Sequence, residues 1–207
     1  MEIKALPLGY IRVNCYLIKT EKAAIVIDPG YKNEKIDEFL LENKDKERLI
    51  LLTHAHFDHI GALPALRDKT GVKIAIGEDE NELLADGSLN LSDRFHAHIP
   101  PFSADVFLKD SEELVIGDIK IKTIFTPGHT KGSVCYLIEN VLFSGDTLFY
   151  ESVGRTDFPT SDFSKLASSV KKLYTLPDET VVFSGHGEST TISHEKKYNP
   201  FVNSENL

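Results

Sequence analysis

The chain has 207 residues, a length typical of one domain and sufficient to bury a hydrophobic core. Hydrophobic residues make up 41% and charged residues 27%, which excludes collagen-like, coiled-coil and disordered chains. The 32 acidic residues outnumber the 23 basic ones and give a net charge of −9, which argues against binding to nucleic acids or anionic membranes, since both need a basic surface. We therefore expect a single domain over residues 1–207, with neither nucleic acid nor membrane as a partner.

The expected location of the protein is the cytoplasm. No apolar run approaches the ~18 residues that a membrane-spanning helix needs, and the first ten residues lack the charged-then-apolar order of a secretory signal. Cys15 and Cys135 lie far apart, so they predict ordinary buried thiols and no disulfide framework. The sequence does not indicate the oligomeric state.

The first half of the chain alternates strand-like apolar runs with helical patterns. Strands are expected at about Tyr10 to Ile18 and at Ala24–Ile27, Leu49–Leu52 and Val72–Ile76. Helices are expected at Glu34–Glu42, Ile60–Lys69 and Asn81–Ala85. Residues Asp86–Ser103 then break the periodicity with Gly, Ser, Asn and a Pro-Pro pair, which predicts a long loop of the kind that forms lids or binding sites.

The second half begins with strand after strand. Residues Val106 to Phe143 contain only short apolar runs, expected to be mostly antiparallel, and Phe163–Tyr174 is an amphipathic helix. A last strand at Thr180–Phe183 and a short helix at Ser193–Lys197 follow. Many strands with few intervening helices predict two packed sheets with helices outside. The fold class is therefore α/β, a layered sandwich rather than a doubly wound parallel sheet.

Four candidate metal ligands lie close together directly after an apolar strand. They are His54, His56, Asp58 and His59. The i, i+2 spacing of the first two histidines lets both side chains point the same way from an extended segment. Imidazole nitrogen and carboxylate oxygen bind zinc, iron or manganese. The segment predicts a metal site at the point where the chain bends into a helix.

Three more candidates sit in comparable places. His129, Asp146 and His186 each follow an apolar strand and lie beside a glycine. Loops at the ends of strands are where a rigid sheet holds site residues. Five of the eight histidines occupy such positions, which indicates one common site.

The number of ligands fits two divalent ions better than one. The expected sets are His54, His56 and His129 for the first ion and Asp58, His59 and His186 for the second, with Asp146 bridging both. Such ions lie about 3.5–4 Å apart and share a water whose pKa they lower to about 7. The nucleophile is then a hydroxide that Asp58 orients, and no protein nucleophile is needed.

The motifs resemble those of the metallo-β-lactamase superfamily. The resemblance rests on Thr53–His59, on Pro127–Thr130, on Ser144–Thr147 and on Gly185–Gly187. It implies a four-layer αββα sandwich with a dinuclear site at one edge of the paired sheets, and the same seven ligands.

Within the superfamily, two segments resemble the glyoxalase II (hydroxyacylglutathione hydrolase) branch. They are Gly145–Phe149 and Gly154–Phe158. That branch adds a helical C-terminal domain, and the chain is expected to lack it because it ends soon after His186. The resemblance implies hydrolysis of a small thioester, with a hydroxyacylglutathione-type thioester as one candidate. It also implies two divalent metal ions, with zinc as the first candidate and iron or manganese as alternatives.

Other functions stay open. The segment Gly154–Asp157 also resembles the persulfide dioxygenases, which hold a single iron. A lactone or another ester is a further substrate class on the same chemistry, and non-catalytic metal binding is a third possibility.

Four residues have two interpretations each. Arg155 binds a substrate carboxylate or pairs with Asp157. Asp28 braces a ligating histidine or only forms an Asp-Pro-Gly turn. His96 and His98 are surface residues of the long loop or contribute to a substrate pocket.

Overall fold

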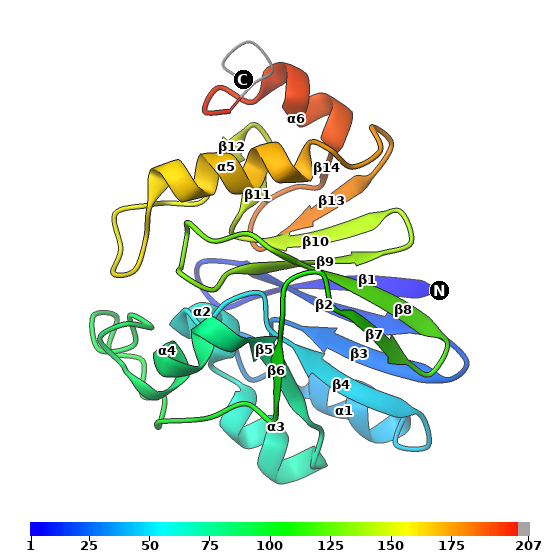
Figure 1. The fold of residues 1–207 in the computed structure, drawn as a ribbon. Coiled ribbons are helices and arrows are strands. Elements are labelled where there is room, and N and C mark those ends of the chain that lie inside the picture. The colour runs from blue at the N-terminus through cyan, green and yellow to red at the C-terminus, as the bar shows by residue number, and fades with distance from the viewer. Residues whose placement is uncertain (203–207) are drawn as a thin grey trace.

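Strands that are apolar on both faces produce a sandwich of two sheets in the computed structural model, which describes residues 1–202 (Figure 1). The first sheet contains, in spatial order, β1 (Glu2–Leu8), β2 (Val13–Lys19), β3 (Ala23–Ile27), β4 (Glu47–Leu51), β5 (Ile74–Gly77) and β6 (Val106–Leu108). The second contains β14 (Thr190–Thr191), β13 (Val181–Ser184), β10 (Val141–Gly145), β9 (Val134–Ile138), β8 (Ile119–Phe125) and β7 (Glu113–Ile116).

Helices cover the outer face of each sheet. The first sheet carries α1 (Glu34–Glu42), α2 (Phe57–Ile60), α3 (Leu63–Thr70), the 3-10 helix η1 (Glu78–Glu80) and α4 (Asn81–Ala85). The second carries α5 (Phe163–Leu173) and α6 (Ile192–Tyr198), with the hairpin β11 (Leu148–Phe149) and β12 (Ser152–Val153) beside them. The predicted α/β four-layer αββα sandwich is thus confirmed.

Three hydrophobic clusters fill the spaces between the four layers. In β3, Val26 packs toward the helices of the first sheet, whereas Ile25 and Ile27 face the second sheet. A third cluster joins α5, through Val170 and Leu173, to the outer face of the second sheet. Because successive side chains of a strand point to opposite faces of the sheet, one strand contributes to two hydrophobic clusters. Burial of apolar side chains on both faces is the main term that stabilises the fold.

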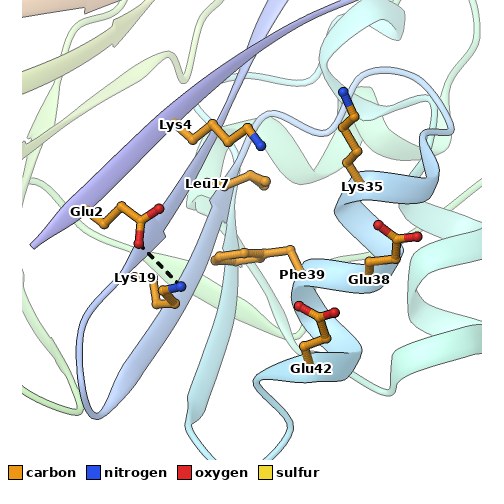
Figure 2. A pocket seen from close by; sticks show the side chains of 8 residues that line it. All are labelled: Glu2, Lys4, Leu17, Lys19, Lys35, Glu38, Phe39 and Glu42. Atoms are coloured by element: carbon orange, nitrogen blue, oxygen red, sulfur yellow. Dashed lines mark ion pairs between the residues drawn. The ribbon is translucent and has the colours of Figure 1, made fainter.

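Helix α1 illustrates how the outer layer attaches. Asn33 caps its N-terminus by accepting a hydrogen bond from the backbone N–H of Lys35 at 3.0 Å. Ile36 and Leu40 are fully buried, and Phe39 lies over Leu17 of β2 in a shallow groove (Figure 2). Charged side chains surround the contact between Phe39 and Leu17 in that groove.

The two sheets meet at one edge through backbone contacts. Val13 and His186 form an isolated antiparallel bridge, and the backbone N–H of Asn14 donates to the carbonyl of Gly185 at 2.7 Å. The Asn14 side chain donates to the carbonyl of Ser184 at 3.1 Å. These contacts fix the start of β2 against the end of β13.

Most predicted elements are found within a few residues of their expected bounds, including the loop Asp86–Ser103, and β7 to β10 pair antiparallel as expected. The first predicted strand begins too early, since Gly9 and Arg12 have positive φ angles and turn the chain, and β1 precedes them. The two-residue strands β11, β12 and β14 were not predicted either.

The helix predicted at Ile60–Lys69 is found as α3, which begins later, at Leu63, and a separate short helix, α2, precedes it and ends before Gly61. An added Cβ at Gly61 would lie 2.3 Å from the carbonyl oxygen of Gly30, so the chain needs glycine there to pass closely. Asp58 and His59 consequently lie on α2 rather than before a helix. Cys15 and Cys135 are buried and unpaired, as expected. Among the described residues, no helix has the length and apolar character needed to cross a bilayer.

Candidate metal centre

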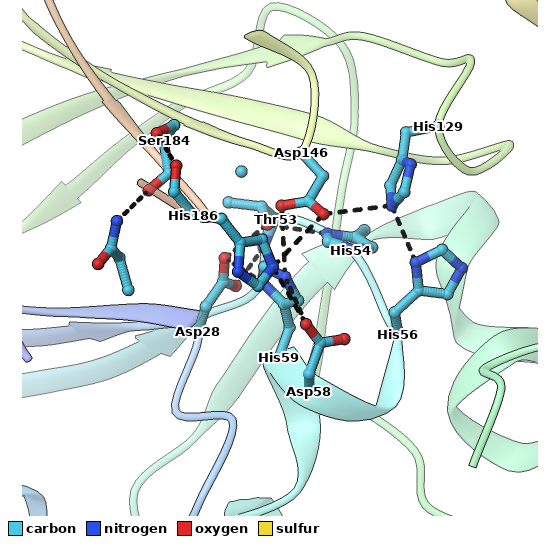
Figure 3. A network of polar contacts seen from close by, with 12 residues as sticks. Asp28, Thr53, His54, His56, Asp58, His59, His129, Asp146, Ser184 and His186 are labelled. Atoms are coloured by element: carbon cyan, nitrogen blue, oxygen red, sulfur yellow. Dashed lines mark hydrogen bonds and ion pairs between the residues drawn. The ribbon is translucent and has the colours of Figure 1, made fainter. Parts of the chain in front are cut away.

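The seven predicted ligands come from four loops that meet at one edge of the sandwich (Figure 3). One loop follows β4 of the first sheet, and the others follow β8, β10 and β13 of the second. Strands β10 and β13 run parallel, so their carboxyl ends coincide and bring Asp146 next to His186. Gly145, with a φ of 50°, lets β10 turn directly over Thr53, where an added Cβ would lie 2.3 Å from the hydroxyl oxygen.

The ligand atoms form two clusters with Asp146 between them. The three-histidine cluster is His54, His56 and His129, and the Asp58 cluster is Asp58, His59 and His186. In each group the candidate ligand atoms lie within 4.8 Å of one another, as they do in the overlapping group of His54, His59 and Asp146. The structure thus brings together all seven residues that the sequence singled out, and ligation by them stays a prediction.

Distances place Asp146 in contact with both clusters. One carboxylate oxygen lies 3.5 Å from His129 Nε2 and 3.7 Å from His186 Nε2, and the other lies 3.4 Å from His59 Nε2. In the Asp58 cluster, Asp58 Oδ2 lies 3.2 Å from His186 Nε2. His56 Nδ1 lies 2.9 Å from His129 Nε2 in the other cluster. A carboxylate that faces two clusters is suited to bridging two cations.

Buried atoms without hydrogen-bond partners show that the donors fit cations. Nε2 of His54, His56 and His59 and Oδ1 of Asp146 are buried, and none has a hydrogen-bond partner among the described residues. Leaving such a group unsatisfied costs about 1–3 kcal/mol. Imidazole nitrogen and carboxylate oxygen are the donors that zinc, iron and manganese accept. The site therefore fits divalent cations on its own geometry.

Asp28 braces the site, which resolves the two interpretations of this residue. Its Oδ2 lies 2.9 Å from Nδ1 of His59, and its two oxygens accept hydrogen bonds from the backbone N–H and the hydroxyl of Thr53, at 2.8 and 2.6 Å. The Thr53 hydroxyl uses its only hydrogen on Asp28, so at 3.1 Å it accepts from Nδ1 of His54. Both histidines are thereby left with Nε2 toward the centre.

Backbone carbonyls orient two further histidines. His129 Nδ1 donates to the carbonyl of Arg155 at 2.8 Å, and His186 Nδ1 donates to the carbonyl of Ile11 at 3.2 Å. These bonds select the tautomer that exposes the Nε2 lone pair. They also assign a role to main-chain atoms of Arg155 and Ile11, which no side-chain pattern in the sequence indicates.

Glu80 is a buried carboxylate that sequence reasoning missed. It is fully buried, and its two oxygens accept the backbone N–H groups of Ala55 and Gly132, each at 2.8 Å. Ala55 lies between His54 and His56, and Gly132 belongs to the loop that carries His129. Burial raises the pKa of Glu80, although these hydrogen bonds oppose the shift. One side chain therefore ties together the two loops of the three-histidine cluster.

Electrostatics differ between the clusters. Burial, with the neighbouring histidine charges, lowers the pKa of His54 well below its ordinary value and that of His56 to about 3. Burial alone would also lower the pKa values of His59 and His186, but the carboxylates of Asp58 and Asp146 outweigh it and raise both. The three-histidine cluster is therefore neutral, while the Asp58 cluster holds its protons more tightly.

The rim beside the three-histidine cluster is aromatic and basic. The ring of Phe158 lies 5.5 Å from that of His56, and the guanidinium of Arg155 lies 4.5 Å above the Phe158 ring. Arg155 also forms two hydrogen bonds with Asp157, at 2.9 and 2.7 Å, in an exposed pair. The structure thus contains the Arg155–Asp157 bridge, and carboxylate binding by Arg155 stays a prediction. The exposed His96 and His98 line a separate pocket together with Phe57.

Comparison with known families and curated proteins gives consistent results. Residues 8–186 match the family model described as the Metallo-beta-lactamase superfamily. The chain is 38% identical to the probable metallo-hydrolase YqgX of Bacillus subtilis, over 100% of both chains. It is 36% identical to the hydroxyacylglutathione hydrolase GloC of Haemophilus influenzae, over 99% of this chain and 100% of that protein.

Solved structures with similar folds include three above 30% identity. The BLEG-1 B3 metallo-beta-lactamase has a TM-score of 0.88 at 41% identity, over 97% of this chain and 99% of that one. TTHA1623 in a di-iron-bound form has a TM-score of 0.84 at 34%, over 96% and 100%. ETHE1 from Myxococcus xanthus has a TM-score of 0.79 at 31%, over 97% and 84%. The names of these proteins differ in the reaction they suggest, so the reaction of this chain must be argued from its site.

Proposed function

Because this chain belongs to the metallo-beta-lactamase superfamily, we propose that it is a metal-dependent hydrolase that cleaves a small thioester. The observation that carries the proposal is the convergence of seven histidine and aspartate side chains, in which the buried Nε2 atoms of His54, His56 and His59 and Oδ1 of Asp146 have no hydrogen-bond partner among the described residues. Similarity to GloC, which is named a hydroxyacylglutathione hydrolase, supports a hydroxyacyl thioester as the first candidate substrate.

The geometry of the site indicates which side chains would hold the cations. The three-histidine cluster would bind one ion and the Asp58 cluster the other, with Asp146 shared. Two bound divalent ions, zinc as the first candidate and iron or manganese as alternatives, would supply an activated water at neutral pH and polarise the thioester carbonyl. Asp28, Glu80 and the carbonyl of Arg155 would keep the ligands in place, as the partners of metal ligands generally do.

Asp58 is the proposed catalytic residue among the ligands. Its pKa is lowered, because the charges of His59 and His186 outweigh the effect of burial, so the carboxylate is ionised at neutral pH. An ionised carboxylate accepts a hydrogen bond from the attacking water and orients it. In the reaction a C–O bond forms, the C–S bond breaks, and the electron pair leaves on sulfur. Thiols have a pKa of about 8.5, so their departure needs no strong acid.

The test combines metal analysis with a substrate panel. Protein loaded with zinc or iron should bind about two ions and hydrolyse S-lactoylglutathione or a simpler acyl thioester. His56→Gln should abolish this activity. His194→Gln, which alters a histidine paired with Glu151 outside the site, is the matched control and should retain it. Loaded protein that hydrolyses no thioester would overturn the proposal.

Two other reactions belong in the same panel. Persulfide oxidation at a single iron is favoured by the segment Gly154–Asp157, and it would give one ion per chain and oxygen consumption. Against it stands the Asp58 cluster, whose three ligands would then have no ion to hold. Similarity to BLEG-1 supports testing a β-lactam beside a lactone.

A further inference from the structure

A cavity of about 480 Å³ lies beside the Asp58 cluster and has no role in the proposed chemistry so far. One wall comes from the segments that follow β1 and β3, with Tyr10, Tyr31 and Lys32. The other wall comes from α2 and the loop Asp86–Ser103, with Phe57 and Phe95. We call this cavity the aromatic pocket. Its volume is within the range of small-molecule sites.

One backbone approach and two chain connections place the aromatic pocket next to the Asp58 cluster. Phe57 directly precedes Asp58 on α2. Gly30, which lines the pocket, lies so close to α2 that an added Cβ would be 1.4 Å from the backbone oxygen of Asp58. Tyr10 directly precedes Ile11, whose carbonyl accepts the hydrogen bond from His186 at 3.2 Å. The pocket therefore lies next to the backbone that carries Asp58 and to the carbonyl that orients His186.

The walls have a defined chemistry. The rings of Phe57 and Phe95 stack with centroids 4.8 Å apart, and Tyr10 meets Tyr31 edge to face at 6.3 Å. Tyr10 is 71% and Phe95 42% exposed, so these rings present apolar surface to a ligand. Lys32 and two histidines also line the pocket, while none of its described lining residues is acidic, in a chain with 32 acidic residues. Apolar walls with a cation suit a ligand that is apolar and ends in an anion.

The long loop that forms this wall is held in a defined conformation by burial and by backbone hydrogen bonds. Leu91 is buried, and Asn90 connects the loop to α2 by accepting the backbone N–H of Phe57 at 2.9 Å. Leu91 and His96 have positive φ angles of 68° and 53°, which cost free energy at non-glycine residues. Backbone hydrogen bonds within the loop, such as Ala97 N–H to the carbonyl of Ser92 at 2.8 Å, hold this conformation. The pocket is therefore preformed.

We propose that the aromatic pocket binds the thiol half of the thioester substrate, and that this half is an apolar thiol, about the size of a benzyl group, carrying a carboxylate near Lys32. The inference rests on the proposed thioester hydrolysis. It assigns the acyl half to the rim beside the three-histidine cluster, where the ring of Phe158 lies 5.5 Å from that of His56. Hydrolysis then leaves the free thiol in the pocket and the carboxylic acid at the Phe158 rim.

The first experiment varies each half of the substrate in turn on the zinc-loaded protein. Ethyl, benzyl and 4-carboxybenzyl thioacetates share the acyl group and have alkyl thiols as leaving groups. The expected kcat/KM rises about tenfold from ethyl to benzyl, the size of effect that an aromatic contact gives, and rises again for carboxybenzyl. Ethyl thioesters with an acetyl or a phenylacetyl group should differ less. Equal rates across the thiol series, or a larger effect in the acyl series, would overturn the assignment.

Variants test the two walls separately. Phe95→Ala should raise KM for the benzyl substrate about five- to tenfold, with kcat and the ethyl substrate nearly unchanged. Lys32→Gln should remove only the added preference for carboxybenzyl. Phe163→Ala, at an exposed phenylalanine of α5, is the matched control and should leave all rates unchanged. Loss of kcat for every substrate in Phe95→Ala would contradict a binding role.

A binding measurement separates this inference from the proposed function. The thioether 4-(methylthiomethyl)benzoate cannot be hydrolysed, and NMR titration should show shifts at Phe95 and His96 that Phe95→Ala weakens. Binding of the thioether by a protein that hydrolyses no thioester would support the pocket and overturn the reaction. Thioester hydrolysis with no shifts in the pocket would support the reaction and overturn the pocket.

Discussion

The three-histidine cluster and the Asp58 cluster differ in how they are prepared for a cation. His54, His56 and His129 are each at most 3% exposed and have lowered pKa values. In the Asp58 cluster the His186 side chain is 27% exposed, and His59 and His186 have raised pKa values. The first cluster is dry and neutral, so it offers lone pairs directly. The second must release protons before it binds a cation.

The partners of the two clusters explain this difference. Glu80 acts on the backbone of the three-histidine cluster, by accepting the N–H groups of Ala55 and Gly132, so it fixes the geometry of the ligands. Asp28 contacts the ring of His59 directly and favours its charged form. A buried carboxylate thus fixes backbone geometry in one cluster and favours a protonated ligand in the other. The comparison predicts four measurable outcomes.

The largest effect is expected for Asp146→Asn, because Asp146 contacts both clusters. The amide keeps the size of the side chain and loses its charge. Affinity for both ions should fall by more than about 100-fold, beyond the range for partners of metal ligands, and activity should be lost. Metal analysis after dialysis measures this. Retention of two ions would show that Asp146 is not shared.

Glu80→Gln should weaken only the three-histidine cluster. The amide leaves one of the two backbone N–H groups without an acceptor, and an effect of about 10–100-fold on affinity is typical for such partners. Cobalt(II) titration followed by absorption resolves the two positions. Glu82→Gln, two residues further along the chain in an exposed pair with Lys131, is the control. Equal weakening of both positions would instead indicate a general loss of structure.

Lowering the pH should remove the ion of the Asp58 cluster first. The raised pKa values of His59 and His186 mean that protons compete with the cation as the pH falls, by about tenfold per pH unit for each proton displaced. His56, with a pKa of about 3, does not compete in this range. Protein equilibrated with a weak chelator should keep two ions at pH 8 and one at pH 6. Simultaneous loss of both would contradict the comparison.

The smallest effect is expected for Arg155→Gln. Its guanidinium is paired with Asp157 and is solvent-exposed, while the contact with His129 uses the backbone carbonyl, which the substitution retains. We expect kcat/KM within about twofold, as for most changes of exposed ion pairs. A tenfold rise in KM for a carboxylate-bearing substrate would show instead that Arg155 binds it.

The sequence indicated the layers because burial on both faces leaves uninterrupted apolar runs such as Ala23–Ile27. Strand β1 was missed since Glu2 and Lys4 are exposed on an edge strand and Pro7 interrupts its end. The candidate ligands were recognisable because each follows such a run. Their convergence needed the parallel pairing of β10 with β13, which local pattern does not encode.

The supporting residues were less visible. Glu80 follows Glu78 and Asp79, and this acidic run is typical of a solvated surface. Only the tertiary structure shows that the third member turns inward while Glu78 and Asp79 stay exposed. Main-chain acceptors such as the carbonyl of Arg155 have no signature at all, since any residue supplies the same atom.

The backbone bridge between Val13 and His186 has a thermodynamic consequence. It lies where ligands from β4 of one sheet meet ligands from β8, β10 and β13 of the other, so cations bound there act as cross-links between distant parts of the chain. Binding that requires the folded arrangement adds its free energy to folding. Removal of metal should therefore separate the sheets first at this contact, detectable as faster hydrogen exchange of the Asn14 amide, which donates to the carbonyl of Gly185.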